Sequence, residues 1–263
     1  LMKTKNRFSY ILWCNDTLAV ASDYWWTDRN TKSYLFNPQD ASSTPKVISD
    51  RNFQDRYSDP GDLVGKRNQY SRTVLALKDG YAFLMGDGFT EKGQFPFLDK
   101  LNIQTLEKER LYESPFTDKM ETLNDFDVDE DELLVRIQSP NDYPNYFFRK
   151  LGQDDLNQIT QFENPFRGLQ NVHKEVLKYK RDDGLDLSGT LYLPPNYDRD
   201  NPEKLPMILW AYPREFKDKS SAGQTTQNPN RFTYPYWGSP IYWLTKGYVI
   251  LDGASFPIVG AGD

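Results

Sequence analysis

Few residues of this chain could carry out nucleophilic catalysis. The sequence contains one histidine, His173, and one cysteine, Cys14. A catalytic serine needs a histidine as its base, and in the arrangement G-x-S-x-G two glycines flank the serine on a sharp turn. The nearest approach is Gly253-Ala254-Ser255-Phe256-Pro257, which lacks the second glycine. We therefore expect His173 to be a linker or surface residue, and we do not expect Ser255 to be a nucleophile.

The residue types indicate no metal or cofactor site. A single cysteine allows neither a disulfide within this chain nor a cysteine-based metal site. The acidic run from Asp125 to Glu132 could suit calcium only if glycine stood at the sixth position of the loop and glutamate at the twelfth. Those positions hold Glu130 and Arg136. We therefore predict an exposed turn there, and no bound metal or cofactor.

The composition allows a folded core and argues against some partners. Of the 263 residues, 38% are hydrophobic and 15% are aromatic, and aromatic side chains bury a large area each. The length suits two domains or one large domain. The formal net charge of -6 argues against a nucleic-acid partner, and no apolar run approaches the ~20 residues of a membrane span. The compartment stays open between bacterial periplasm and cytoplasm.

Three similar stretches in the first half predict repeated β-structure. Each begins with an acidic turn, at Asp16, Asp79 and Asp131, which is followed by a short apolar strand, a polar turn and an aromatic strand. Each ends with another short strand, at residues 46–48, 109–112 and 158–160. Aspartate and glycine favour turns, whereas aromatic and β-branched residues favour strands. Each stretch shows three strands, and we interpret the pattern as three repeats of four strands.

Such repeats are typical of β-propeller blades, which recur every ~40–50 residues. The interval from Asp16 to Asp79 is longer, and a polar insert at residues 51–71 accounts for the difference. Because a propeller needs ~4–8 blades to close, we interpret residues 1–165 as its C-terminal blades and expect more blades upstream. A β-sandwich with irregular loops is the alternative.

The second half of the chain has a different pattern. A connector at residues 162–170 contains proline and glycine, and we place the domain boundary there, so that the second domain covers residues 166–263. Two alternating segments, residues 176–180 and 187–193, flank Asp182-Asp183-Gly184. This arrangement predicts a β-hairpin.

A strand, a helix and a second strand are predicted next. The apolar run at residues 206–212 predicts a strand buried on both faces, as in a parallel sheet. Ser239 and Pro240 favour the start of a short helix at residues 241–246, and Gly247 favours its end. Residues 248–252 predict another buried strand. The predicted fold class is therefore mixed, with all-β propeller blades followed by the N-terminal part of an α/β-hydrolase domain.

Six strings of the sequence carry a resemblance to a known family. They are Ser139-Pro140-Asn141-Asp142-Tyr143-Pro144-Asn145-Tyr146-Phe147, Gly189-Thr190-Leu191-Tyr192-Leu193-Pro194-Pro195-Asn196-Tyr197, Trp210-Ala211-Tyr212-Pro213-Arg214-Glu215-Phe216, Ala222-Gly223-Gln224, Asn228-Pro229-Asn230-Arg231-Phe232 and residues 247–263. With them the chain resembles the prolyl oligopeptidase family of serine peptidases, in its glutamyl endopeptidase-like branch. Before Ser139 the resemblance is one of architecture alone.

This resemblance implies a propeller that covers the active site of an α/β-hydrolase domain and admits only peptides or small unfolded substrates. The implied chemistry is acyl transfer, in which a serine attacks the peptide carbonyl, a histidine takes its proton and an aspartate orients the histidine. The catalytic triad is expected beyond Asp263. The chain alone should therefore be inactive.

The resemblance also implies that part of the oxyanion hole lies within the chain. One donor in this fold comes from the loop after the third strand, and in relatives of the family an aromatic side chain there often donates. An ungapped reading places Trp210 at that position, Tyr212 is the alternative, and both could simply pack in the strand. Arg214 could bind a substrate carboxylate, which suits cleavage after acidic residues. Alternatively, Arg214 forms an ion pair with Glu215.

We therefore predict a segment of a serine endopeptidase that acts on peptides. The alternative is a non-catalytic β-propeller binding module whose hydrolase part is degenerate, because no triad residue is present. A truncated sheet would expose the edge of the strand at residues 248–252, and bare edges pair with other strands. We expect the remainder of the hydrolase domain, or another chain, to cover that edge.

Overall fold

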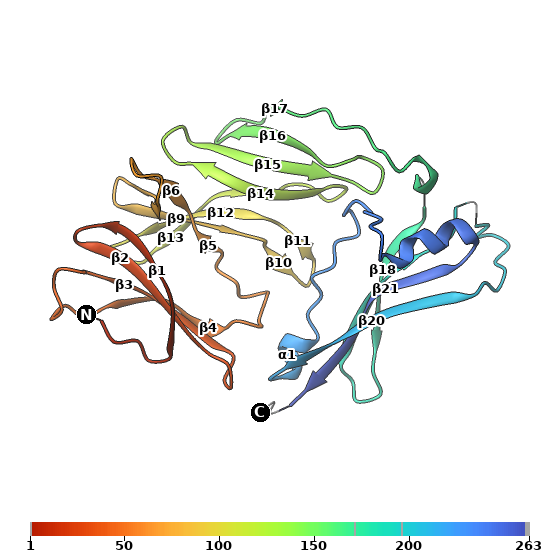
Figure 1. Cartoon of the computed structure of the whole chain (residues 1–263), viewed down its shortest axis with the longest axis horizontal. Coiled ribbons are helices and arrows are strands. Elements are labelled where there is room, and N and C mark those ends of the chain that lie inside the picture. The colour runs from red at the N-terminus through yellow and green to blue at the C-terminus, as the bar shows by residue number, and fades with distance from the viewer. Residues whose placement is uncertain (1, 171, 196, 261–263) are drawn as a thin grey trace.

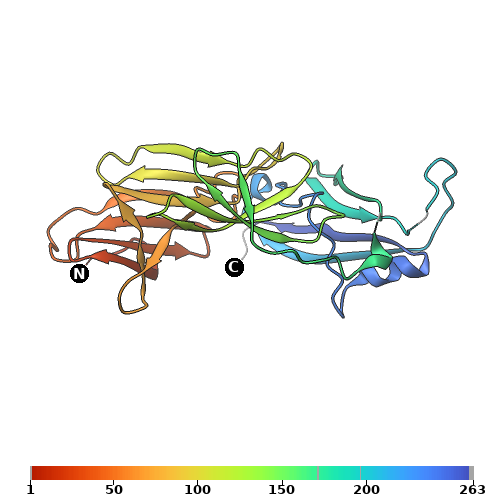
Figure 2. The ribbon, with the colours of Figure 1, turned by 90° about the horizontal axis from the view of Figure 1, so that it is seen from above.

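The structure, a computed structural model, describes residues 2–170, 172–195 and 197–260. It is nearly all β-sheet (Figure 1). Three antiparallel sheets follow one another along the first part of the chain, and a mixed four-stranded sheet forms the second part. Figure 2 shows an elongated molecule with the first sheet near one end and the mixed sheet at the other.

The first sheet has four strands in sequence order. They are β1 (Arg7–Asn15), β2 (Leu18–Trp25), β3 (Asn30–Phe36) and β4 (Lys46–Asn52). Each neighbouring pair is antiparallel. The predicted turn at Asp16 joins β1 to β2, and the Oδ1 atom of Asn15 accepts a hydrogen bond from the Thr17 amide there at 3.0 Å. This turn is therefore confirmed.

The second sheet has the strand order β13–β12–β9–β5, and β8 also pairs with β9. Its strands are β5 (Asp62–Leu63), β8 (Leu77–Lys78), β9 (Tyr81–Gly86), β12 (Phe97–Asn102) and β13 (Lys108–Glu113). Asp79 and Gly80 make the predicted turn between β8 and β9, with φ angles of 52° and 81°. Two-stranded ribbons flank the sheet, formed by β6 (Gly65–Arg67) with β7 (Thr73–Leu75) and by β10 (Phe89–Thr90) with β11 (Gly93–Gln94). The predicted insert therefore supplies β5 and one strand of a ribbon.

The third sheet again has four antiparallel strands in sequence order. They are β14 (Met120–Asp127), β15 (Glu132–Gln138), β16 (Asn145–Lys150) and β17 (Leu156–Gln158). The predicted turn at Asp131 lies between β14 and β15, where Asp131 has φ 52°. Among the described residues, no group of three or more His, Cys, Asp or Glu side chains is placed to hold a metal ion.

The three antiparallel sheets pack on one another through apolar side chains. Val20 and Leu35 of the first sheet join Ala82 of the second in one core cluster, while Leu98 of the second sheet joins Leu133 of the third in another. Complete burial of a leucine is worth about 1.5–3 kcal/mol, and Leu98 and Leu133 have no exposed surface. Two apolar clusters thus hold the series of sheets together, one between the first and second sheets and one between the second and third.

The fourth sheet contains the predicted hairpin and the predicted parallel pair. It consists of β18 (Lys174–Lys180), β19 (Asp186–Tyr192), β20 (Met207–Phe216) and β21 (Val249–Val259), in the order β18–β19–β21–β20. The first two strands are antiparallel, and β20 and β21 are parallel. Gly184, with φ 82°, makes the turn of the hairpin.

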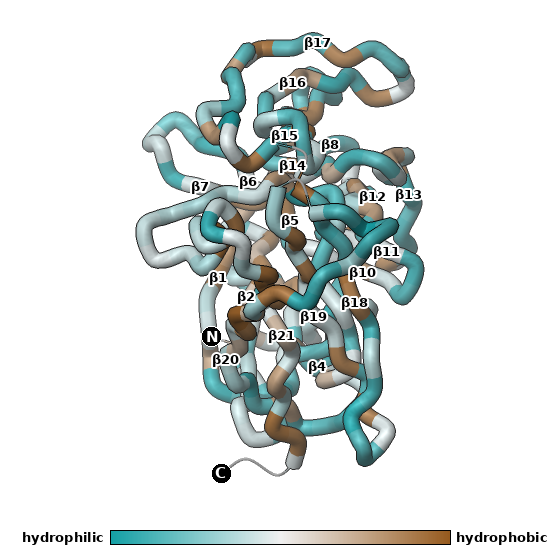
Figure 3. Tube along the Cα trace, turned by 90° about the vertical axis from the view of Figure 1, so that its right-hand side faces the viewer, coloured by the Kyte–Doolittle hydropathy of each residue, from teal (hydrophilic) through white to brown (hydrophobic). Residues whose placement is uncertain are grey.

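Two expectations for the fourth sheet were wrong. The strand at residues 206–212 was expected to be buried, but β20 is largely exposed, because it lies at the sheet edge with one neighbour. The exposed edge was expected at residues 248–252, but β21 pairs with β19 on one side and with β20 on the other. β21 lies between β19 and β20, and this leaves β20 as the bare edge of the sheet. Figure 3 shows hydrophobic colour on β21 where it runs toward the C-terminus.

The predicted short helix is present as the 3-10 helix η2 (Pro240–Lys246). The Ser239 hydroxyl accepts a hydrogen bond from the Ile241 amide at 3.2 Å, and Gly247 ends the helix with φ 81°. Ile241 and Leu244 pack on Ile250 of β21, which fixes the helix on the sheet. The other helices are η1 (Arg167–Leu169) and α1 (Lys219–Ala222). None of the helices in the described ranges has the length and apolar character needed to cross a membrane.

Candidate substrate-binding strand at the sheet edge

The predicted site residues lie on β20, beside an irregularity in its pairing with β21. The register shifts between Leu209 and Ala211, so that Trp210 lies opposite two residues of β21, Asp252 and Gly253. Gly253 has φ 58°, a left-handed conformation that glycine adopts without steric cost. A β-bulge bends a strand and changes the direction of the side chains beside it. Trp210 therefore stands at the one point of β20 where the ladder is interrupted.

All three predicted site residues are accessible. Trp210 and Tyr212 are 50% and 80% exposed, and Arg214 is exposed as well. Tyr212 and Arg214 are two positions apart on a strand, so that their side chains point to the same face. Within the described part of the chain, the Tyr212 hydroxyl has no hydrogen-bond partner and Arg214 has no ion pair. Both groups are free to contact a ligand on that face.

The carboxylate of Glu215 pairs with Arg29 rather than with Arg214. The distance from Arg29 Nη2 to Glu215 Oε2 is 3.9 Å. Arg29 is 1% exposed, its Nη1 donates to the Trp26 carbonyl at 2.6 Å, and its guanidinium lies 3.9 Å from the centroid of the Trp26 ring. Successive side chains of a strand point to opposite faces, which separates Arg214 from Glu215. The ion pair considered as an alternative for Arg214 is therefore not formed.

The other two residues considered for catalysis lie in different places. His173 precedes β18, where its Nε2 atom is 3.6 Å from Glu175 and its Nδ1 atom is 3.4 Å from Arg199. Ser255 lies on β21, and its hydroxyl accepts a hydrogen bond from the Ser188 amide at 3.2 Å. No hydrogen bond among the described residues joins His173 to Ser255.

Two titratable residues near the bulge were missed by the sequence reasoning. Burial, together with the nearby charge of Arg231, lowers the pKa of Lys174 to about 8. The Lys174 ammonium donates to the Arg231 carbonyl at 2.5 Å. Burial also raises the pKa of Asp252, which lies opposite Trp210. Nothing in the sequence near Lys174 signals this environment, because Arg231 approaches it from a distant loop.

A groove separates the fourth sheet from the second sheet and its ribbon. Its volume is about 750 Å³, and its walls include Lys178, Asp186 and Lys219 from one side and Tyr57 and Glu91 from the other. Tyr57 and Glu91 also line a second hollow of about 710 Å³ on the second sheet. Pockets of this size suit ligands of a few hundred daltons or short peptides. The two parts of the chain therefore border an open groove whose volume suits a small ligand.

The fold resembles parts of solved peptidase structures. The chain is similar to oligopeptidase B from Leishmania major, with a TM-score of 0.51 and 10% identity over 94% of this chain and 38% of that one. It is also similar to an acylaminoacyl peptidase, with a TM-score of 0.52 and 13% identity over 100% of this chain and 34% of that one. At these identities the likeness concerns the fold alone. The arrangement of sheets is thus one that peptidases contain. No protein-family model matches the chain.

Sequence similarity gives a more specific resemblance than the fold. The whole chain is 35% identical over 278 residues to a protein of Arabidopsis thaliana named "Probable glutamyl endopeptidase, chloroplastic". The predicted resemblance to the glutamyl endopeptidase-like branch of the prolyl oligopeptidase family is thereby confirmed. The chain spans less than a third of the length of the curated relatives that it matches.

Proposed function

We propose that this chain is a segment of a serine endopeptidase that hydrolyses peptide bonds through an acyl-enzyme. The observation that carries the proposal is the similarity to a glutamyl endopeptidase over the full length of the chain, at 35% identity. The series of sheets supports the proposed division into the C-terminal blades of a β-propeller at residues 1–165 and the start of an α/β-hydrolase domain at residues 166–263. A hairpin followed by a strand, a helix and a parallel strand suits the beginning of such a hydrolase sheet.

In this proposal the chain supplies the propeller wall and one side of the active site. The serine, histidine and aspartate of the triad lie outside residues 1–263. Tyr212 donates its hydroxyl to the oxyanion of the tetrahedral intermediate, and Trp210 is the alternative donor. The exposure of both side chains at the edge strand supports this role. One such donor is worth about 10²–10³ in kcat.

We further propose that Arg214 recognises an acidic residue of the substrate. A guanidinium binds a carboxylate through two parallel hydrogen bonds. Arg214 suits this role because Glu215, its nearest acidic neighbour in the sequence, is engaged by Arg29. Cleavage after acidic residues follows from this contact.

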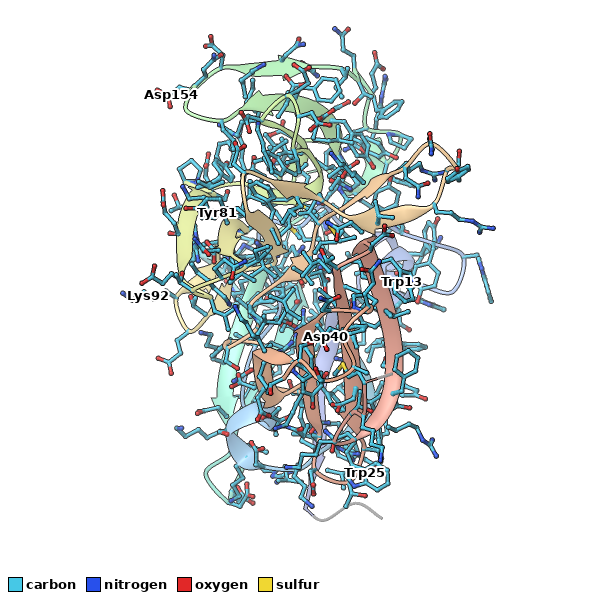
Figure 4. All side chains as sticks on the ribbon, turned by 90° about the vertical axis from the view of Figure 1, so that its left-hand side faces the viewer. Trp13, Trp25, Asp40, Tyr81, Lys92 and Asp154 are labelled. Carbon is cyan, nitrogen blue, oxygen red and sulfur yellow. The ribbon has the colours of Figure 1, made fainter. Side chains whose placement is uncertain are left out.

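The edge of β20 must be covered in the proposed enzyme. Its free backbone groups and its apolar side chains, including Met207 and Leu209 at 54% and 56% exposure, would otherwise face water. We propose that the remainder of the hydrolase domain pairs with β20, or that a second copy of the chain does. The outer face of the first sheet is also exposed at Trp13 and Trp25, which are labelled in Figure 4, and this supports further blades upstream.

The proposed function is tested by labelling the full-length protein with a fluorophosphonate, which reacts with activated serines. We expect one serine outside residues 1–263 to be labelled, in a G-x-S-x-G sequence, and we expect residues 1–263 alone to stay unlabelled. A full-length protein that takes up no label would instead be the non-catalytic binding module. Label on Ser255 would contradict the proposed position of the triad.

A further inference from the structure

Two segments that are distant in sequence lie against one another between the two parts of the chain. One is the last residue of β4 with the loop that follows it, residues 52–57, which we call the clamp. The other is residues 215–225, which run from the end of β20 through α1. Figure 1 shows the loop after β4 approaching α1. Each segment supplies side chains that bind the backbone of the other.

The amide of Gln54 holds the end of β20 at two points. Its Nε2 atom donates to the Glu215 carbonyl at 2.7 Å, and its Oε1 atom accepts from the Lys217 amide at 3.0 Å. A neighbouring strand would use the same pair of backbone groups. The side chain of Gln54 therefore fixes the backbone on both sides of Phe216, directly after Arg214.

The far end of the held segment is fixed by Gln224. Its Oε1 atom accepts from the Arg56 amide at 2.7 Å, and its Nε2 atom donates to Asp55 at 2.7 Å. The hydroxyl of Tyr57 accepts from the Thr225 amide at 3.1 Å. The clamp thus binds both ends of residues 215–225.

Between these ends, Asp218 joins α1 to the clamp. One carboxylate oxygen of Asp218 accepts from the backbone amide of Ser221 at 2.7 Å and caps the helix. The other accepts from the side-chain Nδ2 atom of Asn52 at 3.0 Å. The same Asn52 nitrogen lies 3.3 Å from the Ser221 hydroxyl. The clamp therefore holds the short helix at its N-terminus as well.

The β-ladder supports Arg214 on one side only. Arg214 lies opposite Pro257 of β21, and Pro213 precedes it on β20. On its other side β20 has no neighbouring strand among the described residues. The two hydrogen bonds of Gln54 therefore supply, directly after Arg214, the support that this free edge of β20 lacks from a neighbouring strand.

We propose that Gln54 is a positioning residue for substrate specificity, which holds the end of β20 so that Arg214 meets an acidic side chain of the substrate. This inference rests on the proposed function, because it assigns to Gln54 the placement of the residue proposed to bind the substrate. Tyr212 depends less on the clamp, because it lies three positions before Glu215, whereas Arg214 adjoins Glu215. Loss of the clamp should therefore affect recognition of the acidic residue more than the chemical step.

The experiment compares Gln54→Met with wild type in the full-length protein, because methionine keeps the length of the side chain and removes both hydrogen bonds. The substrates are two peptides that differ only in glutamate or glutamine before the cleaved bond. A displacement of about 1 Å can cost on the order of 100-fold, and we expect kcat/KM for the glutamate peptide to fall about 10- to 100-fold, mainly through KM. We expect kcat/KM for the glutamine peptide to change less than about twofold. Gln69→Met, in the exposed turn of the β6–β7 ribbon, is the matched control and should behave like wild type.

Hydrogen exchange of a peptide spanning residues 215–218 reports on the clamp independently of activity. Gln54→Met should speed exchange of the Lys217 amide, whereas Gln69→Met should not. Equal losses for the two substrates, or no loss for either, would overturn the positioning role. Unchanged exchange would overturn the clamp itself. A wild-type protein that cleaves neither peptide would overturn the proposed function and, with it, the specificity role of Gln54. If its Lys217 amide were still protected from exchange, the clamp itself would stand.

Discussion

Tyr212 is the residue on which the proposed chemistry can be tested most simply. Its hydroxyl is free within the described part of the chain, and its side chain is 80% exposed. We expect Tyr212→Phe in the full-length protein to lower kcat about 10²–10³-fold, because one oxyanion donor is lost. KM should change little, because the donor acts on charge that develops in the transition state. Trp210→Phe is the comparison variant. A loss of kcat in Trp210→Phe but not in Tyr212→Phe would contradict the assignment of Tyr212 as the donor.

A second residue-scale prediction concerns the buried charge of Lys174. Its pKa in the folded chain is about 8, below its ordinary value of 10.5. Between these values the unfolded chain binds more protons than the folded chain, so stability rises with pH. Below pH 8 the folded chain carries the full cost of the buried charge, and this cost disappears as the pH rises through 10.5.

The measurement is the free energy of unfolding of wild type minus that of Lys174→Met, at several pH values. Each pKa unit corresponds to about 1.4 kcal/mol, so we expect the wild type to gain on the order of 2 kcal/mol relative to the variant between pH 8 and 10.5. The difference should be flat between pH 6 and 7. A difference that stays constant up to pH 10.5 would show that Lys174 is not desolvated.

Individual residues were the hardest features to predict. The sequence singled out Arg214, which lies on β20, but it could not show that Glu215 pairs with Arg29, which comes from the turn between β2 and β3. The burial of Lys174 was missed for the same reason, since Arg231 belongs to a distant loop. Such contacts depend on how sheets meet, and no local pattern reports them.

At the scale of elements, the turn after β9 leaves no room for a side chain at Gly88. It lies between β9 and β10 with φ 64°, and a Cβ atom there would lie 1.7 Å from the Phe95 carbonyl oxygen. We expect Gly88→Ala to destabilise the chain by about 1–3 kcal/mol, because the positive φ and the contact must both be relieved. Urea unfolding of residues 1–263 measures the change.

Gly168 in η1 is the matched control for Gly88. It has no positive φ, and nothing lies within 4 Å of its Cβ position. We expect Gly168→Ala to change stability by no more than about 0.5 kcal/mol. Equal effects at the two positions would show that the turn after β9 adapts more easily than the structure indicates.

Elements whose pattern is local were predicted well. The hairpin around Gly184 and the helix between Ser239 and Gly247 rest on turn and capping residues a few positions apart, and both are present. The exposure of β20 was not predicted, because an apolar strand reads the same whether it lies inside a sheet or at its edge. The position of β20 in the sheet depends on where β21, which comes later in the sequence, pairs. The residues of β20 alone do not encode this.

At the scale of the molecule, the bare edge of β20 makes a prediction about protection from hydrogen exchange. Edge strands with free backbone groups recruit partners. We expect peptides from residues 207–212 to be protected in the full-length protein and to exchange faster in residues 1–263 at low concentration. Protection that appears only as concentration rises would show that a second copy covers the edge. Fast exchange in the full-length protein would contradict any covering partner.

The central claim is that the acyl-transfer residues lie outside these 263 residues while the chain forms one wall of the site. Hydrolysis of a glutamate-containing peptide, followed by mass spectrometry, tests it most directly in two samples, the purified full-length protein and residues 1–263 alone. We expect cleavage after glutamate by the full-length protein and none by residues 1–263. Cleavage by residues 1–263 alone, free of contaminating peptidases, would contradict the claim.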